Sequence, residues 1–308
     1  MAINVAANKA FILYDSILED GTLSLTGAGS PTVVAGALAN IIDRLTFTTA
    51  TISLSSFRVD CDLGSGNSAK ADTFAMTGHV YHRATGATAL GGFTLDVQWS
   101  DNGSSYTSVP GVTPEAKTDR TFIHSWDGDG SAHRYWRIAI TDDGAIPDAS
   151  SVKIATMALG LRLDIGYMSD GFDDYGLSLK YEQARSRNGT FLGSTVSHVT
   201  QNVRLRLDQA GVANTFIFDK SVGEQSYHGS LPTWDHFVAT CWAQGKPFWF
   251  AWTVDYVSNN DNPTHQGTWY AMPSKKARIS APFISSTRRK LNLDMDVLVE
   301  GMFDWSTV

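Results

Sequence analysis

Strict alternation of apolar and polar side chains is the dominant pattern along this chain. In the segment 93–99 every second residue is apolar, beginning with Phe93 and ending with Trp99. A period of two residues is typical of a β-strand with one buried face. The segments 134–141 and 291–297 repeat the pattern. Most of the chain is therefore expected to fold into β-strands.

The segment after the first of these strands predicts a hairpin. Residues 100–105 are polar and include Asn102-Gly103, a pair that readily adopts the positive φ angles of a tight turn. Residues 106–109 are then expected to return as the partner strand.

One amphipathic helix interrupts the strand pattern, over residues 234–243. Thr233 can cap its start, and Gly245 and Pro247 end it. The segment 248–252 that follows is apolar on both faces, so it is expected to be an inner strand covered on both sides. The apolar residues of the helix recur at i, i+3, i+4, i+7 and i+8, at Trp234, Phe237, Val238, Cys241 and Trp242.

These patterns predict an all-β fold with two β-sandwich or jelly-roll domains, the second of which carries the amphipathic helix. The polar stretch 166–176, rich in Asp and Gly, contributes no core-forming run and marks the domain junction. We therefore expect domains at 1–165 and 166–308. Residues 35–43 form a weaker second helix candidate, with a loop as the open alternative.

Composition fits a folded protein of this kind. Hydrophobic residues make up 43% of the 308 residues and charged residues only 18%, which argues against disorder. The aromatic share of 11% and the 27 glycines favour many short strands joined by tight turns. The N-terminus has no signal-peptide pattern, and no apolar run is long enough to insert into a membrane.

Charge argues against a nucleic-acid partner. The net charge is −7, and residues 1–165 carry −6 of it (11 Lys+Arg against 17 Asp+Glu). The remainder carries −1 (13 against 14), so neither half offers a basic surface. Cys61 and Cys241, 180 positions apart, are expected to be buried free thiols in a reducing compartment.

The sequence contains few candidates for chemistry. His79 and His82 are spaced i, i+3 in a strand or loop, where their side chains would point to opposite sides, so we expect no metal pair. Asp127 and Asp129 are expected in a solvated turn, with a surface calcium ion as the open alternative. The sequence has no nucleophile elbow, phosphate-binding loop or HExxH motif. We therefore expect a protein that is not an enzyme and has no cofactor, although a glycan-cleaving carboxylate pair stays open.

Two basic clusters are candidates for subunit contacts. The first comprises Arg185 and Arg187, and the second Arg288, Arg289 and Lys290. Solvated loop charge is one interpretation. The other is an interface with the acidic first half of another copy, because arginine pairs well with carboxylates across interfaces.

The first half resembles the galactose-binding (discoidin-type) jelly roll. The resemblance is carried by the pairing of Val97–Tyr106 with Arg134–Thr141, which matches a strand ending in SxDG-x-aromatic and a later RYxRI strand. In phage virion proteins this module often begins with a stretch similar to residues 13–23. The resemblance implies a jelly-roll fold.

The second half is similar to the C-terminal parts of phage tail-tip proteins, of which the distal tail (baseplate hub) family fits best. That resemblance implies a structural virion protein, assembled in the host cytoplasm, that forms a homo-oligomeric and usually hexameric ring joining the tail tube to the tip. Its partners would be its own copies, the tail tube and other tail-tip proteins. The alternative is a carbohydrate- or receptor-binding tail protein that contacts a host surface glycan. The matching segments are Ala184–Thr190, Trp234–Trp242, Gly245–Trp252 and Arg288–Val299.

Overall fold

A computed structural model gives the fold of the chain. It describes residues 10–45, 48–53, 56–78, 80–81, 93–109, 115–116, 121–126, 131–142, 152–166, 173–185, 188, 191–208, 232, 234–251, 268–273, 283–285 and 288–297. Antiparallel sheets dominate these residues, and the all-β fold class is confirmed.

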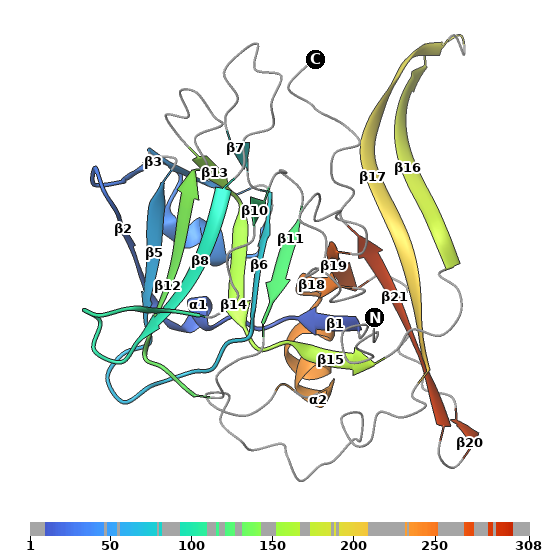
Figure 1. Ribbon diagram of the computed structural model, residues 1–308. Coiled ribbons are helices and arrows are strands. Elements are labelled where there is room, and N and C mark those ends of the chain that lie inside the picture. Colours follow the sequence, from blue (N-terminus) through green and yellow to red (C-terminus); the bar gives the residue numbers. More distant parts are fainter. Residues whose placement is uncertain are drawn as a thin grey trace.

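The sheets stack in three layers, seen from left to right in Figure 1. The first sheet consists of β2 (Thr22–Thr26), β5 (Phe57–Asp62), β12 (Tyr135–Asp142), β8 (Phe93–Ser100), β9 (Thr107–Ser108) and β10 (Glu115–Ala116). The middle layer is the sheet of β11 (Phe122–Ser125), β6 (Thr73–Thr77) and β14 (Thr156–Gly160). A small sheet beside it joins β3 (Val33–Ala35), β4 (Ala50–Ile52), β13 (Val152–Ile154) and β7 (Val80–Tyr81).

The third layer is a single large sheet, the fourth of the structure, and we call it the fourth sheet. It has strands from both ends of the described chain. Its order is β15 (Leu163–Gly166), β1 (Ala10–Leu13), β18 (Phe248–Ala251), β19 (Thr268–Pro273), β21 (Arg288–Val297), β17 (Phe191–Asp208) and β16 (Asp173–Arg185), and β20 (Phe283–Ser285) pairs with β21. β15 is the first strand in this order and β17 is next to the last, yet the two lie close together, so the sheet curls. The domain boundary predicted near residue 165 stays a prediction. β1 precedes that boundary in the sequence but belongs to the same sheet as the strands that follow it.

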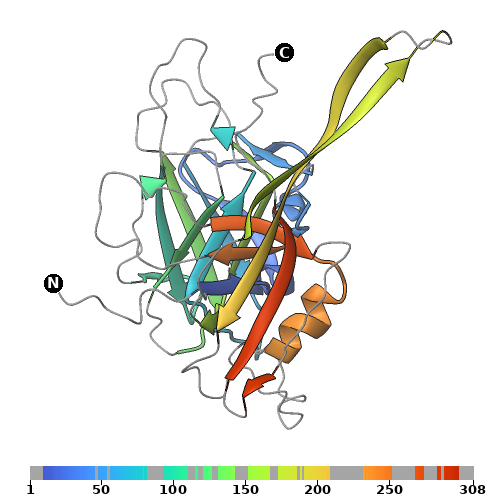
Figure 2. The same ribbon diagram turned by 90° about the vertical axis from the view of Figure 1, so that its right-hand side faces the viewer.

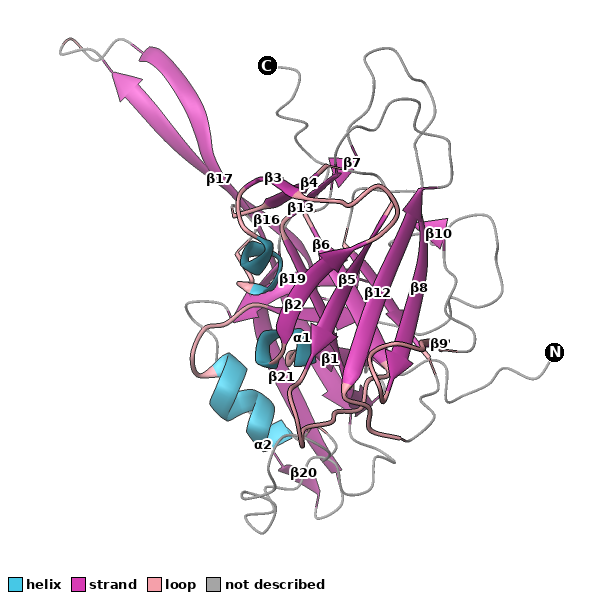
Figure 3. Cartoon of the chain, turned by 90° about the vertical axis from the view of Figure 1, so that its left-hand side faces the viewer, coloured by secondary structure: helices cyan, strands magenta, loops and turns pink. Residues whose placement is uncertain are grey.

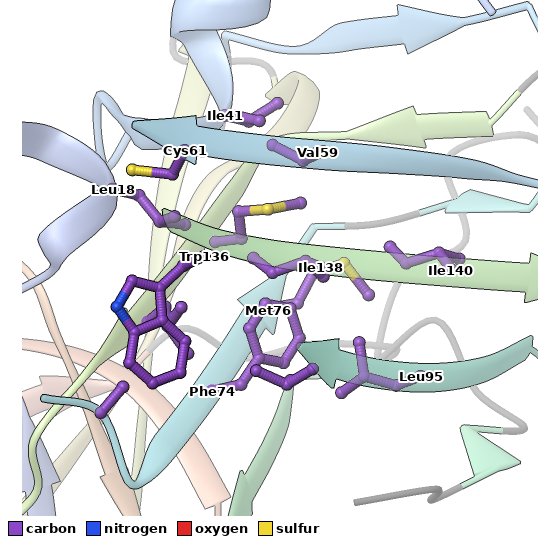
Figure 4. Close-up of a cluster of buried hydrophobic side chains, with 14 of the residues drawn as sticks. Leu18, Ile41, Val59, Cys61, Phe74, Met76, Leu95, Trp136, Ile138 and Ile140 are labelled. Atoms are coloured by element: carbon purple, nitrogen blue, oxygen red, sulfur yellow. The ribbon is translucent and has the colours of Figure 1, made fainter. Parts of the chain in front are cut away.

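The first core fills the space between the first sheet and the middle layer (Figure 4). The alternation predicted for β8 and β12 is present, because Leu95, Val97, Ile138 and Ile140 are fully or almost fully buried. Trp136 completes this face, and its indole N–H donates to two backbone carbonyls. Burial of these alternating side chains supplies the main driving force for packing the two sheets.

The middle layer is buried on both faces. Every residue of β6 and β14 is buried. On β6, Phe74 and Met76 point into the first core, whereas Ala75 points into a second core on the other side. A strand with two buried faces does not alternate between apolar and polar residues.

The second core lies between the middle layer and the fourth sheet, and Trp249 is its largest side chain. Trp249 is completely buried, and its indole N–H donates to the hydroxyl of Thr77 over 2.9 Å. Small residues of the middle layer allow the sheets to approach closely. The buried members are Phe11, Leu13, Ala75, Ile123, Ala158, Trp249, Ala251 and Tyr270.

The predicted helix and the predicted inner strand are both confirmed. The helix consists of α2 (Trp234–Phe237) and a wider π-turn, η4 (Val238–Trp242). The ring centroids of Phe237 and Phe248 lie 5.2 Å apart, so the helix covers one face of β18. All four residues of β18 are buried, because the second core covers the other face.

The weaker helix candidate at residues 35–43 is only partly helical. Ala35 ends β3, and a short 3₁₀ helix, η2, covers Leu38–Ile42. Gly36 separates them with a φ of +76°, and a Cβ there would lie 1.9 Å from the carbonyl oxygen of Thr49. A tight turn at this glycine therefore delays the start of the helix.

A long two-stranded hairpin projects from the body (Figure 2). Residues 201–208 of β17 pair with β21, whereas residues 191–200 pair only with β16 among the described strands. We call the projecting part, residues 178–185 and 191–200, the arm. It begins beyond the domain junction predicted at 166–176, whose last residues belong to β16.

The second core yields a stability prediction. Replacing Trp249 with Ala should lower the free energy of unfolding by about 3–5 kcal/mol, because it leaves a large cavity between the layers. Trp249→Phe should cost less, about 1–3 kcal/mol, since it mainly removes the donor to Thr77. Urea denaturation measures both values. The exposed Val34→Ala is the control, and an equal effect of Trp249→Ala and Val34→Ala would contradict the assignment.

Candidate functional site

The arm is a ribbon with two open edges. Its register places Leu179 opposite Val199 and Tyr181 opposite Val196, with a register shift after Lys180. Among the described strands, residues 178–185 pair only with β17 and residues 191–200 only with β16. No further described strand therefore covers this part of the hairpin.

The two predicted basic clusters lie at opposite ends of β17. Arg185 ends β16 and pairs with Phe191 at the tip of the arm, whereas Lys290 pairs with Asp208 at the other end of the strand. β17 has 18 residues, so the clusters are roughly 55 Å apart. The structure does not bring them together. Arg288 and Arg289 begin β21, and Arg187 lies outside the described residues.

A polar pocket lies where the N-terminal segment meets the C-terminal helix. Its volume is about 250 Å³. Its lining residues come from three separate parts of the chain and most of them are ionisable. They are Tyr14, Asp15, Glu19, Asp20, Arg44, His236, Thr240 and Lys246.

The N-terminal wall of the pocket is held by a helix cap. The hydroxyl of Ser16 accepts from the backbone N–H of Leu18 and from that of Leu159, which ties the short helix α1 (Ile17–Asp20) to β14. The backbone at Asp15 passes close to Gly160, the last residue of β14. A Cβ added to Gly160 would lie 2.4 Å from the carbonyl oxygen of Asp15. Only glycine permits this close approach.

Arg44 lines the pocket and joins the two halves of the chain. Its guanidinium bonds the carboxylate of Glu19 at 2.6 Å and the carbonyl oxygen of Pro247 at 3.2 Å. Its own carbonyl accepts from the hydroxyl of Tyr270 over 2.5 Å. Arg44 adopts a φ of +62°, an uncommon value for a residue with a side chain. Partial burial raises the pKa of Glu19, against the opposing effect of the Arg44 charge.

His236 forms the other wall. Its Nδ1 lies 3.0 Å from the hydroxyl of Tyr14 and 3.9 Å from Asp15 Oδ2. The hydroxyl of Thr240 donates to the carbonyl of His236, one turn earlier in the helix. The π-turn that follows carries Thr240 on the same wall, and such turns are frequent at functional sites.

The outer face of the first sheet, which is turned towards the viewer in Figure 3, carries a second polar arrangement. Arg137 makes two hydrogen bonds to Asp60, of 2.5 and 3.0 Å, and its Cζ lies 3.6 Å from the ring centroid of Tyr106. On the neighbouring strand, Asp96 accepts from Ser108 through Oδ2. Asp96 Oδ1 is shielded from solvent and accepts no hydrogen bond from any residue that the structure describes.

The pair of Asp62 and Arg134 extends this face towards the loops. Two hydrogen bonds of 2.7 and 2.9 Å join them. The hydrogen bond from Arg134 lowers the pKa of the Asp62 carboxyl, so this pair stabilises the fold at neutral pH and ceases to do so as the pH falls through that pKa.

The hairpin loop at the end of β8 is built by its own side chains. The hydroxyl of Ser100 accepts from the backbone N–H groups of Asn102 and Gly103, and Gly103 has the expected positive φ of +72°. Next to it, His133 stacks on Trp99 with ring centroids 3.7 Å apart, and its Nδ1 lies 2.9 Å from Asp101. These contacts fix the loop end of the jelly roll.

The metal candidates named from the sequence lie outside the described residues, at His79, His82, Asp127 and Asp129. Among the residues that are described, no group of three or more His, Cys, Asp or Glu side chains could hold a metal ion. The described part of the chain likewise has no helix long and apolar enough to cross a membrane.

The pocket was not anticipated from the sequence. Asp15 and His236 are 221 positions apart, and only the pairing of β1 with β18 brings their surroundings together. No local periodicity marks either residue, so single-sequence reasoning had no signal to detect.

Comparison with known proteins finds similarity among solved structures. No protein-family model matches the sequence, and no curated protein matches it. Among solved structures, the CBM32 module of AlyQ in complex with 4,5-unsaturated mannuronic acid is 16% identical, with a TM-score of 0.29, covering 44% of this chain and 97% of the module. A CBM32 module from Clostridium perfringens is 11% identical, with a TM-score of 0.33, covering 47% and 98%.

A third solved structure is the C-terminal domain of a chitobiase from Bacteroides fragilis. It is 16% identical, with a TM-score of 0.34, and covers 49% of this chain and 100% of that domain. The solved structures similar to this chain thus include carbohydrate-binding modules.

The two cysteines are buried and free, as expected. Burial raises the pKa of both the Cys61 and the Cys241 thiol to about 12. At mildly alkaline pH both should stay protonated and resist iodoacetamide, since the thiolate is the nucleophile. Mass spectrometry should find both alkylated only after denaturation. Rapid alkylation of either thiol in the native protein would contradict this prediction.

Proposed function

We propose that this chain is a structural subunit that assembles with its own copies, and that the assembly is a ring in the tail tip of a bacteriophage. The observation that carries self-assembly is the projecting arm. A two-stranded ribbon is marginally stable in water on its own, and its open edges invite pairing with another chain. A partner for the arm is therefore part of the proposal.

The strand pairing of the arm supports this function. Residues 191–200 of β17 pair only with β16 among the described strands, so neither edge of the ribbon has a further strand beside it there. Most soluble oligomers are symmetric assemblies of identical copies. Distal tail identity, the hexameric ring and virion localisation rest on the resemblance of residues 184–190, 234–252 and 288–299 to tail-tip proteins.

Shortening the arm tests self-assembly. Replacing residues 178–200 with an Asn-Gly turn joins Leu177 to Gln201, which are already paired, so the fourth sheet keeps its register. The full chain should sediment as an oligomer, with rings in negative-stain images, and the shortened chain as a folded monomer. Circular dichroism checks that the variant is folded. A full chain that is monomeric at high concentration, or a shortened chain that still forms rings, would overturn the proposal.

Glycan binding by the outer face of the first sheet is the second candidate function. The observation that favours it is the half-buried ring of Tyr106 against Arg137, on the same sheet as the hydrogen-bonded pair of Asp96 and Ser108. An aromatic ring flanked by fixed polar groups is the usual composition of a binding site for a polar ligand. The ligand would be a host surface glycan, as in the alternative of a carbohydrate- or receptor-binding tail protein.

A glycan array tests this candidate. We expect a discrete set of bound saccharides, lost in Tyr106→Ala and retained in Tyr106→Phe, because phenylalanine keeps the ring. Trp249→Phe serves as the control for a general loss of stability, since that residue lies in the second core. No binding by the unaltered chain, or equal binding by Tyr106→Ala, would exclude the outer face as the site.

A further inference from the structure

The outer face of the first sheet carries an arginine whose charge is available to a ligand. Arg58 lies in β5 between the buried residues Phe57 and Val59, so its side chain points to the outer face, where it is exposed. Its guanidinium has no hydrogen bond or ion pair with any residue that the structure describes. By contrast, Arg134 and Arg137 are each held by an aspartate of β5.

The strand register defines the neighbours of Arg58. Ala139 of β12 lies opposite Arg58, and Asp96 of β8 lies opposite Ala139. Directly opposed residues point to the same side, so the three form one row across the strands β5, β12 and β8, which lie side by side in Figure 3. Two strand spacings separate the α-carbons of Arg58 and Asp96 by about 10 Å. The short side chain of Ala139 leaves room between them for a ligand group.

The β8 end of this row presents fixed hydrogen-bond acceptors. Asp96 Oδ2 accepts from the side-chain amide of Gln98 over 2.6 Å and from the hydroxyl of Ser108 over 2.9 Å. These bonds orient the amide, and its oxygen accepts no hydrogen bond from any residue in the described part of the chain. An amide oxygen held in this way accepts from hydroxyl groups of a ligand.

The β5 end presents donors suited to a carboxylate. Arg137 lies diagonal to Arg58 and gives its Nε and one terminal nitrogen to Asp60, which leaves its second terminal nitrogen. Guanidinium groups bind carboxylates through paired N–H groups, with charge assistance. A neutral sugar would leave the charge of Arg58 uncompensated, whereas an acidic sugar would compensate it.

We propose that the outer face of the first sheet binds a saccharide that carries a carboxylate group, which pairs with the guanidinium of Arg58 while neighbouring hydroxyls donate to the amide oxygen of Gln98. This inference rests on the second candidate function, glycan binding by this face, and specifies the class of ligand. Residues 1–165 carry a net charge of −6, so the bulk charge repels such a ligand and the attraction is local.

Matched acidic and neutral saccharides test the carboxylate. The probes are uronate and sialate oligosaccharides on an array beside their methyl esters, which keep the ring and the hydroxyls but lose the charge. The unaltered chain should bind at least one acid about tenfold or more tightly than its ester, as expected for a close charge pair at an interface. Titration calorimetry with that pair measures both affinities.

Removal of the cation should abolish this preference. Arg58→Gln should weaken binding of the acid by about tenfold and leave binding of the ester unchanged, because only the acid uses the charge. Lys153→Gln is the matched control, since it removes an exposed cation from β13 in another sheet and should keep the preference. Thermal melting confirms that each variant folds.

A bulky side chain between the two ends tests the placement. Ala139→Leu should abolish binding of acid and ester alike, because it occupies the space beside Arg58 without changing any charge. Thr141→Leu adds bulk at an exposed position of the same strand, two residues further on, and should bind normally. Normal binding by Ala139→Leu would overturn the placement.

The outcomes separate this inference from the candidate function. If acid and ester bind equally well, or if Arg58→Gln keeps the preference, the carboxylate assignment is wrong. Glycan binding by the outer face still stands in that case when Tyr106→Ala loses the saccharide. If the unaltered chain binds no saccharide at all, the candidate function fails and this inference fails with it.

Discussion

The packing of Trp249 against the middle layer is the interaction on which the rest of the structure depends. Its indole is completely buried between two sheets, and its N–H has a fixed partner in Thr77. Ala75 and Ala158 leave room for the ring, so the fourth sheet lies close against the jelly roll. Since β18 is thereby fixed, so are its neighbours β1 and β19, and with them the walls of the pocket and the sheet from which the arm extends.

What could be predicted from the sequence was local. The alternation at 93–99 and the helical spacing at 234–242 each reflect one buried face, and a single buried face leaves a period in the sequence. The apolar run at 248–251 predicted a strand covered on both sides, and its two covers are the helix and the jelly roll. The second of these could not be inferred, because alanines such as Ala75 and Ala158 give no strand signal: alanine favours helices and is depleted in strands.

The pocket and the separation of the basic clusters could not be predicted either, because both depend on pairing between distant segments. Asp15 and His236 become neighbours only through the pairing of β1 with β18, and the sequence around neither residue predicts that pairing. Arg185 and Lys290 were both proposed as subunit contacts because of their charge, whereas their separation follows from the 18-residue length of β17. Residue type indicates what a side chain can do, and long-range pairing decides what it meets.

The strand β1 has a consequence for how the chain acquires its structure during synthesis. Residues 10–13 leave the ribosome long before residues 248–251, with which they pair. Until β18 arrives, Phe11, Leu13 and the outer side of the middle layer have no cover, so a growing chain that has completed its jelly roll still exposes apolar surface. The nascent protein is thus most prone to aggregation in this interval, and chaperone binding would be most useful there.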